Sequence, residues 1–361
     1  LVRVMGMIYR IPMTAIIGDK GNGFYSYAYS VYTILLLLSS YSLPLAVSKM
    51  VSAKAQLGQW RNVKRVFICA IAFAIGIGTT FGLIVLIGAQ FFTRVFFHSE
   101  LAAIALRFMA PTILIMALLG VFRGFFQGLQ NTLPTAVSQI VEGLINAIMS
   151  VVFAYFLFDF GHGMDVVSGT TDLGYAWGAA GGAIGTGAGA LAGLIFCFIL
   201  FVAYRKILAV NISRDKTGTQ QEYGDIFRLM LSIALPVILS TALYNLIELV
   251  DGSLFNNIMA SKGMEDVKDS MWGAYNAKAL LLVHIPVSIS SAMAVSLVPT
   301  LTAAYALGHE QTAKSKVHAI LRFISILAFP SAVGLLVLAN PIIKTLFSGD
   351  TSAASTYLQV V

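Results

Sequence analysis

The chain has 361 residues, of which 58% are hydrophobic and only 11% are charged, and its formal net charge is +7. A soluble domain carries roughly 25% charged residues, so this composition excludes a water-soluble globular protein and requires lipid around much of the surface. The positive charge does not indicate a nucleic-acid partner, because the basic residues gather in alternate loops, which is a signal of membrane topology.

Apolar segments long enough to cross a bilayer follow one another along the chain, since a transmembrane helix needs about 20 apolar residues. We expect nine segments and the start of a tenth near residue 352: 1–17, 24–47, 66–90, 102–122, 134–158, 174–204, 228–257, 274–306 and 319–343. The chain opens without an initiator Met and stops inside the tenth segment, so we expect it to be a fragment of a longer protein.

The loops between these segments alternate in charge. The loop after the second segment has no acid and carries Lys49, Lys54, Arg61, Lys64 and Arg65. The loop after the fifth segment carries aspartates, and the loop after the sixth is basic again. The positive-inside rule then places the basic loops and the N-terminus of this multi-pass chain in the cytoplasm.

Residues 273–350 resemble residues 23–100 at a shift of 250 positions; for example, Gly273 and Tyr275 fall on Gly23 and Tyr25. Such a repeat indicates a duplicated unit. The first and seventh segments both run outward, so the halves are parallel repeats related by an axis along the membrane normal. We therefore expect an all-α polytopic membrane protein with a six-helix N-terminal lobe, a cytoplasmic linker and an incomplete C-terminal lobe, at 1–204, 205–226 and 227–361.

Arg10 lies inside the first segment, eight residues before Gly18. At about 1.5 Å per residue this is about 12 Å from the end of the helix, close to the middle of a bilayer core roughly 30 Å thick. A charge at this depth costs on the order of 3 kcal/mol. We therefore expect Arg10 to line a watery cavity, with a structural ion pair as the alternative.

Asn245, Glu248 and Asp251 lie in the seventh segment at a spacing that puts them on one helix face. Two carboxylates and an amide at membrane depth suit a sodium or proton site, because hard cations prefer oxygen ligands. These three residues are our candidates for ion coupling. The alternative is that one of the acids pairs with Arg10 across the lobes.

Other polar or small residues inside the segments have competing explanations. Lys278, in the outer part of the eighth segment, either lines the cavity or extends its amine to the surface. For Glu142 we favour a bond between helices. The sixth segment has a ridge of small residues that indicates close helix packing rather than nucleotide binding, at Gly181, Gly185, Gly189 and Gly193.

The stretch from Arg123 to Glu142 resembles the junction between the fourth and fifth helices of bacterial polysaccharide-biosynthesis flippases. The resemblance is stronger to the branch that contains stage V sporulation protein B and the lipid II flippases. Residues 9–12 and 18–23 resemble the opening of the same branch, and Tyr275 with Lys278 fits its eighth helix. The junction residues that we single out as gating or junction positions are Arg123, Gln127, Gln130, Asn131, Pro134 and Glu142.

The resemblance implies a member of the multidrug/oligosaccharidyl-lipid/polysaccharide exporter superfamily, with two six-helix lobes around a central cavity and transport by alternating access. Related lipid II flippases line that cavity with basic residues on the first, second and eighth helices. Arg10 and Lys278 match the first and eighth, whereas the second segment has no basic residue at depth. The sodium site of those relatives uses the seventh helix, where Asp251 is the match.

The sequence therefore predicts a monomeric flippase that moves lipid II or another lipid-linked oligosaccharide to the outer leaflet, with Na⁺ or H⁺ coupling and no other cofactor. The first alternative is a multidrug/cation antiporter of the same fold, which would favour an acidic, aromatic cavity. A second is a membrane enzyme, for which the sequence shows no catalytic cluster. A third is a structural sporulation or division protein without transport.

Overall fold

The computed structural model of the chain describes residues 9–291, 293, 310–347 and 351–361. Within these ranges all regular structure is helical, which confirms the prediction of an all-α protein. The elements are α2 (Arg10–Leu36), the π-helix η1 (Leu37–Tyr41), α3 (Leu43–Gln56), α4 (Trp60–Phe97), α5 (Ala102–Gly128), α6 (Leu133–Ser168), α7 (Leu173–Ser213), α8 (Tyr223–Ser261), α9 (Glu265–Ala274), the π-helix η2 (Tyr275–Leu280), a helical segment at 281–291, α11 (Glu310–Val337), α12 (Ala339–Leu346) and α13 (Ser352–Val360).

The described part of the chain contains seven helices that are long and apolar enough to cross a membrane. The first of them, Arg10–Gln56, unites the first two predicted segments, and the next five match the third to seventh. The seventh helix, Ala313–Val337, matches the ninth predicted segment. Residues 1–8 and 294–306, which belong to the predicted first and eighth segments, lie outside the described residues.

Gly18 marks the boundary between the first two predicted segments. Its backbone is non-helical, with φ 62° and ψ −175°, and it breaks α2 into two parts. This positive φ is open to glycine at little cost and is unfavourable for residues with a Cβ. The break redirects the helix directly before Asp19, which faces the second half of the chain.

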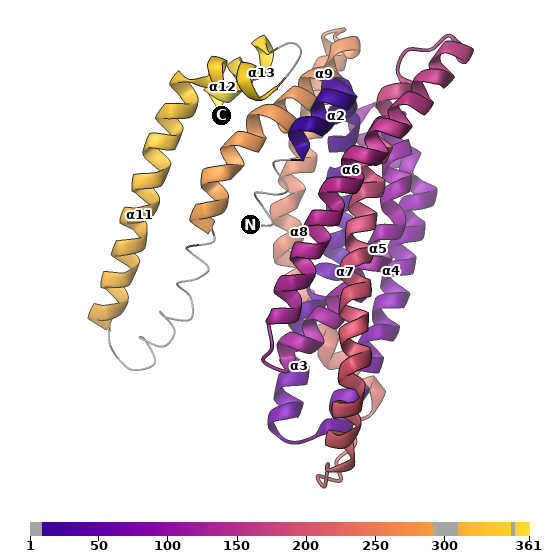
Figure 1. Ribbon diagram of the computed structural model, residues 1–361, viewed down its shortest axis with the longest axis vertical. Helices are drawn as coiled ribbons and strands as arrows, with labels where there is room; N and C mark the ends of the chain where they lie inside the picture. Colours follow the sequence, from indigo (N-terminus) through magenta and orange to yellow (C-terminus); the bar gives the residue numbers. More distant parts are fainter. Residues whose placement is uncertain (1–8, 292, 294–309, 348–350) are drawn as a thin grey trace.

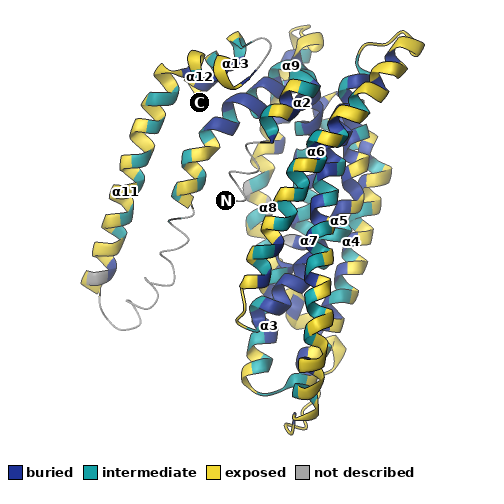
Figure 2. Cartoon of the chain, in the orientation of Figure 1, coloured by how far each residue is buried: buried dark blue, intermediate teal, exposed yellow. Residues whose placement is uncertain are grey.

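The bundle is centred on α2 and α5, which are the most buried of the membrane-length helices (Figure 2). α6 and α7 form a hairpin along its side, and here the glycine ridge packs as predicted: a Cβ added at Gly181 or Gly185 would overlap the backbone of α6 at Ala154 or Ser150. Small residues thus let the two helix axes approach closely. In contrast, α11 stands apart from the bundle in Figure 1, and its apolar side chains are largely exposed.

The two ends of the molecule differ in how the second half of the chain joins the first. At the upper end in Figure 1, α9 packs against α2, and α12 and α13 lie nearby. From there the segment that follows α9 runs down and away from the bundle. The basic loop between α3 and α4 lies at the lower end. The segments after α9 therefore join the bundle at one end and diverge from it toward the other, whereas α8 stays packed on α3 and α4.

At the lower end, the connection between α7 and α8 is irregular only at 214–222, because both helices extend into the segment predicted as a linker. It is fixed to the start of α4. The Asp215 carboxylate accepts hydrogen bonds from the backbone N–H of Arg61 (2.9 Å) and from Thr217. The backbone N–H of Gln221 donates to Asn62. The guanidinium of Arg65 donates to the Gln221 carbonyl and lies 5.0 Å from the Tyr223 ring.

Candidate functional site

A cavity of about 640 Å³ lies between α2, α8 and the segment from α9 to residue 284. Its polar lining comes from both halves of the chain and consists of Arg10, Ser26, Asn245, Glu248, Asp251, Asn276 and His284. Its aromatic lining consists of Tyr25, Tyr29, Trp272 and Tyr275. The structure thus brings Arg10 together with all three candidates for ion coupling, although more than 230 positions separate them in the sequence.

Arg10 lies at the start of α2, where Pro12 follows without a backbone N–H to donate. Its guanidinium carbon is 6.0 Å from the centroid of the Tyr25 ring, within the range of a cation–π contact. Among the described residues, no carboxylate lies within 4.0 Å of this guanidinium. The alternative of an ion pair between Arg10 and an acid of α8 is therefore not realised in this conformation.

Glu248 and Asp251 are exposed on the cavity side of α8, one turn apart, and Asn245 lies a turn before them. The amide nitrogen of Asn245 donates to the Thr241 carbonyl at 2.8 Å, so its amide oxygen is available to the cavity. These three side chains present oxygen atoms along one wall, which is a suitable donor set for a hard cation or a proton. Ion coupling by this wall stays a prediction.

Lys278 lies apart from this cavity. Its amine is 2.8 Å from both carboxylate oxygens of Asp19, and its side chain is only 1% exposed. Lys278 belongs to the π-helix η2, whose wider turn changes the direction of each side chain relative to an α-helix. The expectation that Lys278 lines the cavity or reaches the surface is not met, because the structure places it in an ion pair between η2 and α2.

The contact between α2 and α9 is reciprocal at two glycines. A Cβ added at Gly273 would overlap the carbonyl oxygen of Asp19, and a Cβ added at Gly23 would overlap the carbonyl oxygen of Asp269. The two glycines, and likewise the two aspartates, are 250 positions apart, which is the offset of the repeat. Equivalent residues of the two halves thus meet at the end of the molecule where the halves are joined.

Tyr27 adds a third connection at this end. Its hydroxyl donates to the amide oxygen of Asn256 on α8 at 3.0 Å, and both groups are buried. Its ring stacks on Phe97, with centroids 4.6 Å apart, and lies 6.2 Å from Trp272. The sequence did not indicate a role for Asp19, Tyr27 or Asn256. A charged residue directly after Gly18, at the end of an apolar segment, was the signal that could have predicted the contact between Asp19 and the second half of the chain.

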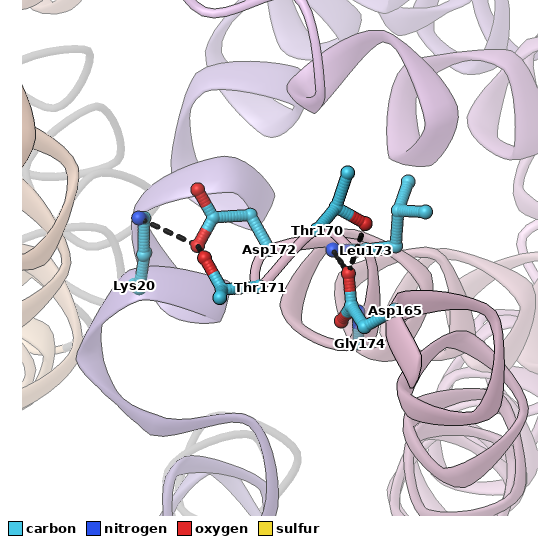
Figure 3. Close-up of polar contacts among 7 residues, drawn as sticks. All are labelled: Lys20, Asp165, Thr170, Thr171, Asp172, Leu173 and Gly174. Atoms are coloured by element: carbon cyan, nitrogen blue, oxygen red, sulfur yellow. Dashed lines mark hydrogen bonds and ion pairs between the residues drawn. The ribbon is translucent and has the colours of Figure 1, made fainter. Parts of the chain in front are cut away.

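The loop between α6 and α7 is also fixed at this end of the molecule (Figure 3). The Asp165 carboxylate accepts hydrogen bonds from the hydroxyl of Thr170 and the backbone N–H groups of Leu173 and Gly174, at 2.6, 3.0 and 2.8 Å. The amine of Lys20 bonds to Asp172 at 2.7 Å. This ion pair joins α2 to the start of α7, so the residue directly after Asp19 is anchored.

The junction residues lie at the turn between α5 and α6, away from the cavity. Arg123 bonds to Glu142 at 2.7 Å and to Ser138 at 2.9 Å, so the favoured interpretation of Glu142 as a bond between helices agrees with the structure. Gln127 donates to Thr135 at 3.2 Å. Asn131 accepts from the backbone of Leu133, Gln130 has a positive φ of 59°, and Pro134 opens α6.

A bundle of membrane-length helices with charged groups around a cavity between two halves is the architecture of a polytopic membrane transporter. The chain belongs to the family of polysaccharide biosynthesis proteins, whose model matches residues 1–304. It has the fold of an inward-facing multidrug resistance MATE family transporter of the MOP superfamily, with a TM-score of 0.72 and 14% identity over 100% of this chain and 76% of that chain.

Curated relatives fit the same family. The lipid II flippase MurJ of Bacillus subtilis (strain 168) is 26% identical over 361 residues, which cover 97% of this chain and 64% of that protein. Stage V sporulation protein B of the same organism is 23% identical over 366 residues, which cover 100% of this chain and 66% of that protein. The chain thus spans just under two thirds of the length of both relatives. The predicted family and fold are confirmed.

Proposed function

We propose that the protein is a flippase that carries a lipid-linked cell-envelope precursor, such as lipid II or another lipid-linked oligosaccharide, across the plasma membrane of a bacterium. The observation that carries this proposal is the Arg10 guanidinium, which faces a cavity between the two halves without a carboxylate partner. A cation held in a low-dielectric cavity attracts the phosphates of such a precursor strongly, because they carry fixed negative charge. The similarity to a lipid II flippase supports this cargo.

In the proposed cycle the described conformation is closed at the outer end. The Lys278–Asp19 pair, the reciprocal glycine contact and the Tyr27–Asn256 bond connect the halves there, whereas the segment after α9 and α11 diverge from the bundle toward the basic loops. With these loops in the cytoplasm, the head group enters from the inner side and binds near Arg10. The outer contacts then separate while the inner ends approach, and the lipid tail stays in the bilayer.

We assign the acidic wall of the cavity to the coupling ion. Asn245, Glu248 and Asp251 contribute oxygen atoms to the cavity that Arg10 also lines. A bound sodium ion or proton would neutralise charge on this wall and so change the attraction between α8 and Arg10. That change gives the ion a different affinity for the two states, which is the requirement for driving a conformational equilibrium.

A cation antiporter remains a second candidate, because one observation favours it. With Lys278 outside the cavity, the described lining has two carboxylates, one guanidinium and four large aromatic rings. Aromatic faces and carboxylates attract organic cations. In this candidate the acids bind the drug or the exchanged ion in turn, and Arg10 repels the cargo rather than holding it.

The test is transport by the full-length protein in proteoliposomes, with fluorescent lipid II, other undecaprenyl-linked sugars and a cationic dye as cargoes. We expect lipid flipping by the wild type, a loss of at least tenfold in Arg10→Ala, and a sodium- or pH-dependent loss in Asp251→Ala. Arg94→Ala is the matched control, because Arg94 is exposed at the end of α4. Dye transport without lipid flipping would replace this proposal by the antiporter.

A further inference from the structure

A second hollow lies between α3 and the first turns of α8 and shares no lining residue with the cavity. This groove has a volume of about 680 Å³. Its apolar part is formed by side chains of both helices, among them Met50, Ile233 and Pro236. The remaining lining includes two cations, Lys49 and Lys54. The groove therefore combines an apolar floor with a positively charged border.

The positive charge of the groove is not balanced locally. None of the lining residues is acidic. Within the described part of the chain, neither Lys49 nor Lys54 has an ion pair or a side-chain hydrogen bond. Lys54 lies in the last turn of α3, where the negative end of the helix dipole favours a cation. Lys49 lies about one and a half turns earlier, outside the last turn of α3, so the helix end does not explain it.

The groove also lies at the level in the membrane where lipid head groups meet the acyl chains. Leu229 and Val237, the first and last groove residues of α8, follow the start of that helix at Tyr223 by about 9 and 21 Å at 1.5 Å per residue. The lysines lie near the end of α3, next to the basic loop. With that loop in the cytoplasm, the border lies among inner-leaflet head groups and the floor among the first carbons of the acyl chains.

We propose that this groove binds an anionic phospholipid of the inner leaflet. Lys49 and Lys54 hold the phosphate, and Met50, Ile233 and Pro236 pack against the upper part of an acyl chain. Lysine suits this role because its flexible stem can lie on apolar surface while its amine reaches the phosphate. Basic pockets between membrane helices on the cytoplasmic side are typical binding sites for anionic lipids.

The proposal goes beyond transport, because this lipid is a resident ligand rather than a cargo. α3 belongs to the first half of the chain and α8 begins the second. These two helices already pack against each other at this end, and a lipid that contacts both would stabilise that packing, independently of what the cavity binds.

The experiment is a titration of the purified full-length protein with dioleoylphosphatidylglycerol or dioleoylphosphatidylcholine, followed by native mass spectrometry. We expect the wild type to retain phosphatidylglycerol in preference to phosphatidylcholine. A basic residue near an anionic membrane contributes about a factor of five in binding, so Lys49→Gln/Lys54→Gln should lower retention about tenfold or more. The matched control is Lys64→Gln/Lys206→Gln, which removes two exposed cations outside the groove.

Equal loss in both double variants would overturn the proposal, because it would show general attraction to anionic lipid. Displacement of phosphatidylglycerol from the groove by equimolar lipid II would assign the groove to the cargo and also overturn it. Elution of each variant at the wild-type volume in size-exclusion chromatography verifies folding. Arg10→Ala should retain phosphatidylglycerol like the wild type even if it does not flip lipid, which separates this test from the test of the proposed function.

Discussion

Gly23 and Gly273 lie against each other's helices at the upper end of the molecule in Figure 1, and each packs on the residue four positions before the other. The space that each glycine leaves is filled by a backbone carbonyl, which has no rotamer with which to move away. The separation of α2 and α9 at this point is therefore set by the missing side chains.

We predict that Gly273→Ala shifts the protein toward an outward-open state. Forcing an extra methyl group into a well-packed contact costs about 1 to 3 kcal/mol, which corresponds to a shift of about 5- to 150-fold in a two-state equilibrium. The measurement is labelling of a cysteine at Ser26, in the cavity, by a membrane-impermeant maleimide added outside the cell, with Cys69 and Cys197 replaced by alanine. Gly76→Ala is the control, because a Cβ there meets no atom within 4 Å. Unchanged labelling in Gly273→Ala would show that this contact does not hold the outer side closed.

The Lys278–Asp19 pair should act in the same direction through charge. Removing one partner of a buried ion pair costs about 3 to 5 kcal/mol, because a charge stays in a poorly solvated place. We therefore expect Lys278→Met to increase labelling at Ser26 strongly. The double variant Asp19→Asn/Lys278→Met should lie closer to the wild type, and so should the swap Asp19→Lys/Lys278→Asp. If the double variant were labelled as strongly as Lys278→Met, the pair would not be the cause of closure.

The Arg123–Glu142 pair should matter for stability rather than for access. Its side chains are 10% and 25% exposed, so Glu142→Ala leaves a mostly buried guanidinium without its acid. We expect a loss of about 3 kcal/mol and a lower unfolding temperature in detergent. Cys69 and Cys197 are free and buried, so a thiol-reactive dye reports unfolding directly. Arg123→Met/Glu142→Leu should unfold at a higher temperature than Glu142→Ala, and a lower one would contradict this explanation.

The linker at 214–222 should detach in acid. Hydrogen bonds from the backbone N–H of Arg61 and from Thr217 lower the pKa of Asp215 from 3.8 to about 2. Because the folded pKa is the lower one, the stabilising contribution is complete above about pH 4 and disappears as the pH falls toward 2. A spin label on Lys216→Cys should be immobile at pH 7 and gain mobility over that range.

Asp215→Asn should make the same label mobile at neutral pH. Asp225→Asn, a change of equal size on the first turn of α8, is its control. A label that stayed immobile in Asp215→Asn would mean that Asn62 and Arg65 hold the linker without the carboxylate.

The sequence predicted the helices well because apolar length alone determines where a chain can cross a membrane. It also predicted that Arg10 lines a cavity, and the structure places Glu248 and Asp251 in the same lining. The depth of Arg10 and Asp251 along their segments was readable from the sequence because both lie well inside apolar stretches. It did not predict the direction of Lys278, because length and hydropathy give the depth of a residue but not its rotation about the helix. The π-helix that turns Lys278 toward Asp19 has no signal in composition.

The reciprocal glycine contact has a consequence for the origin of the chain. A contact in which one surface meets its own equivalent is what a two-fold symmetric dimer has, and it needs no covalent connection between its partners. Each of the two equivalent helices carries a glycine and, four residues earlier, the carbonyl that fills the space left by the partner's glycine. Two copies of a single half could therefore assemble through this surface without a covalent link, which is the arrangement that gene duplication and fusion of a dimer would leave behind.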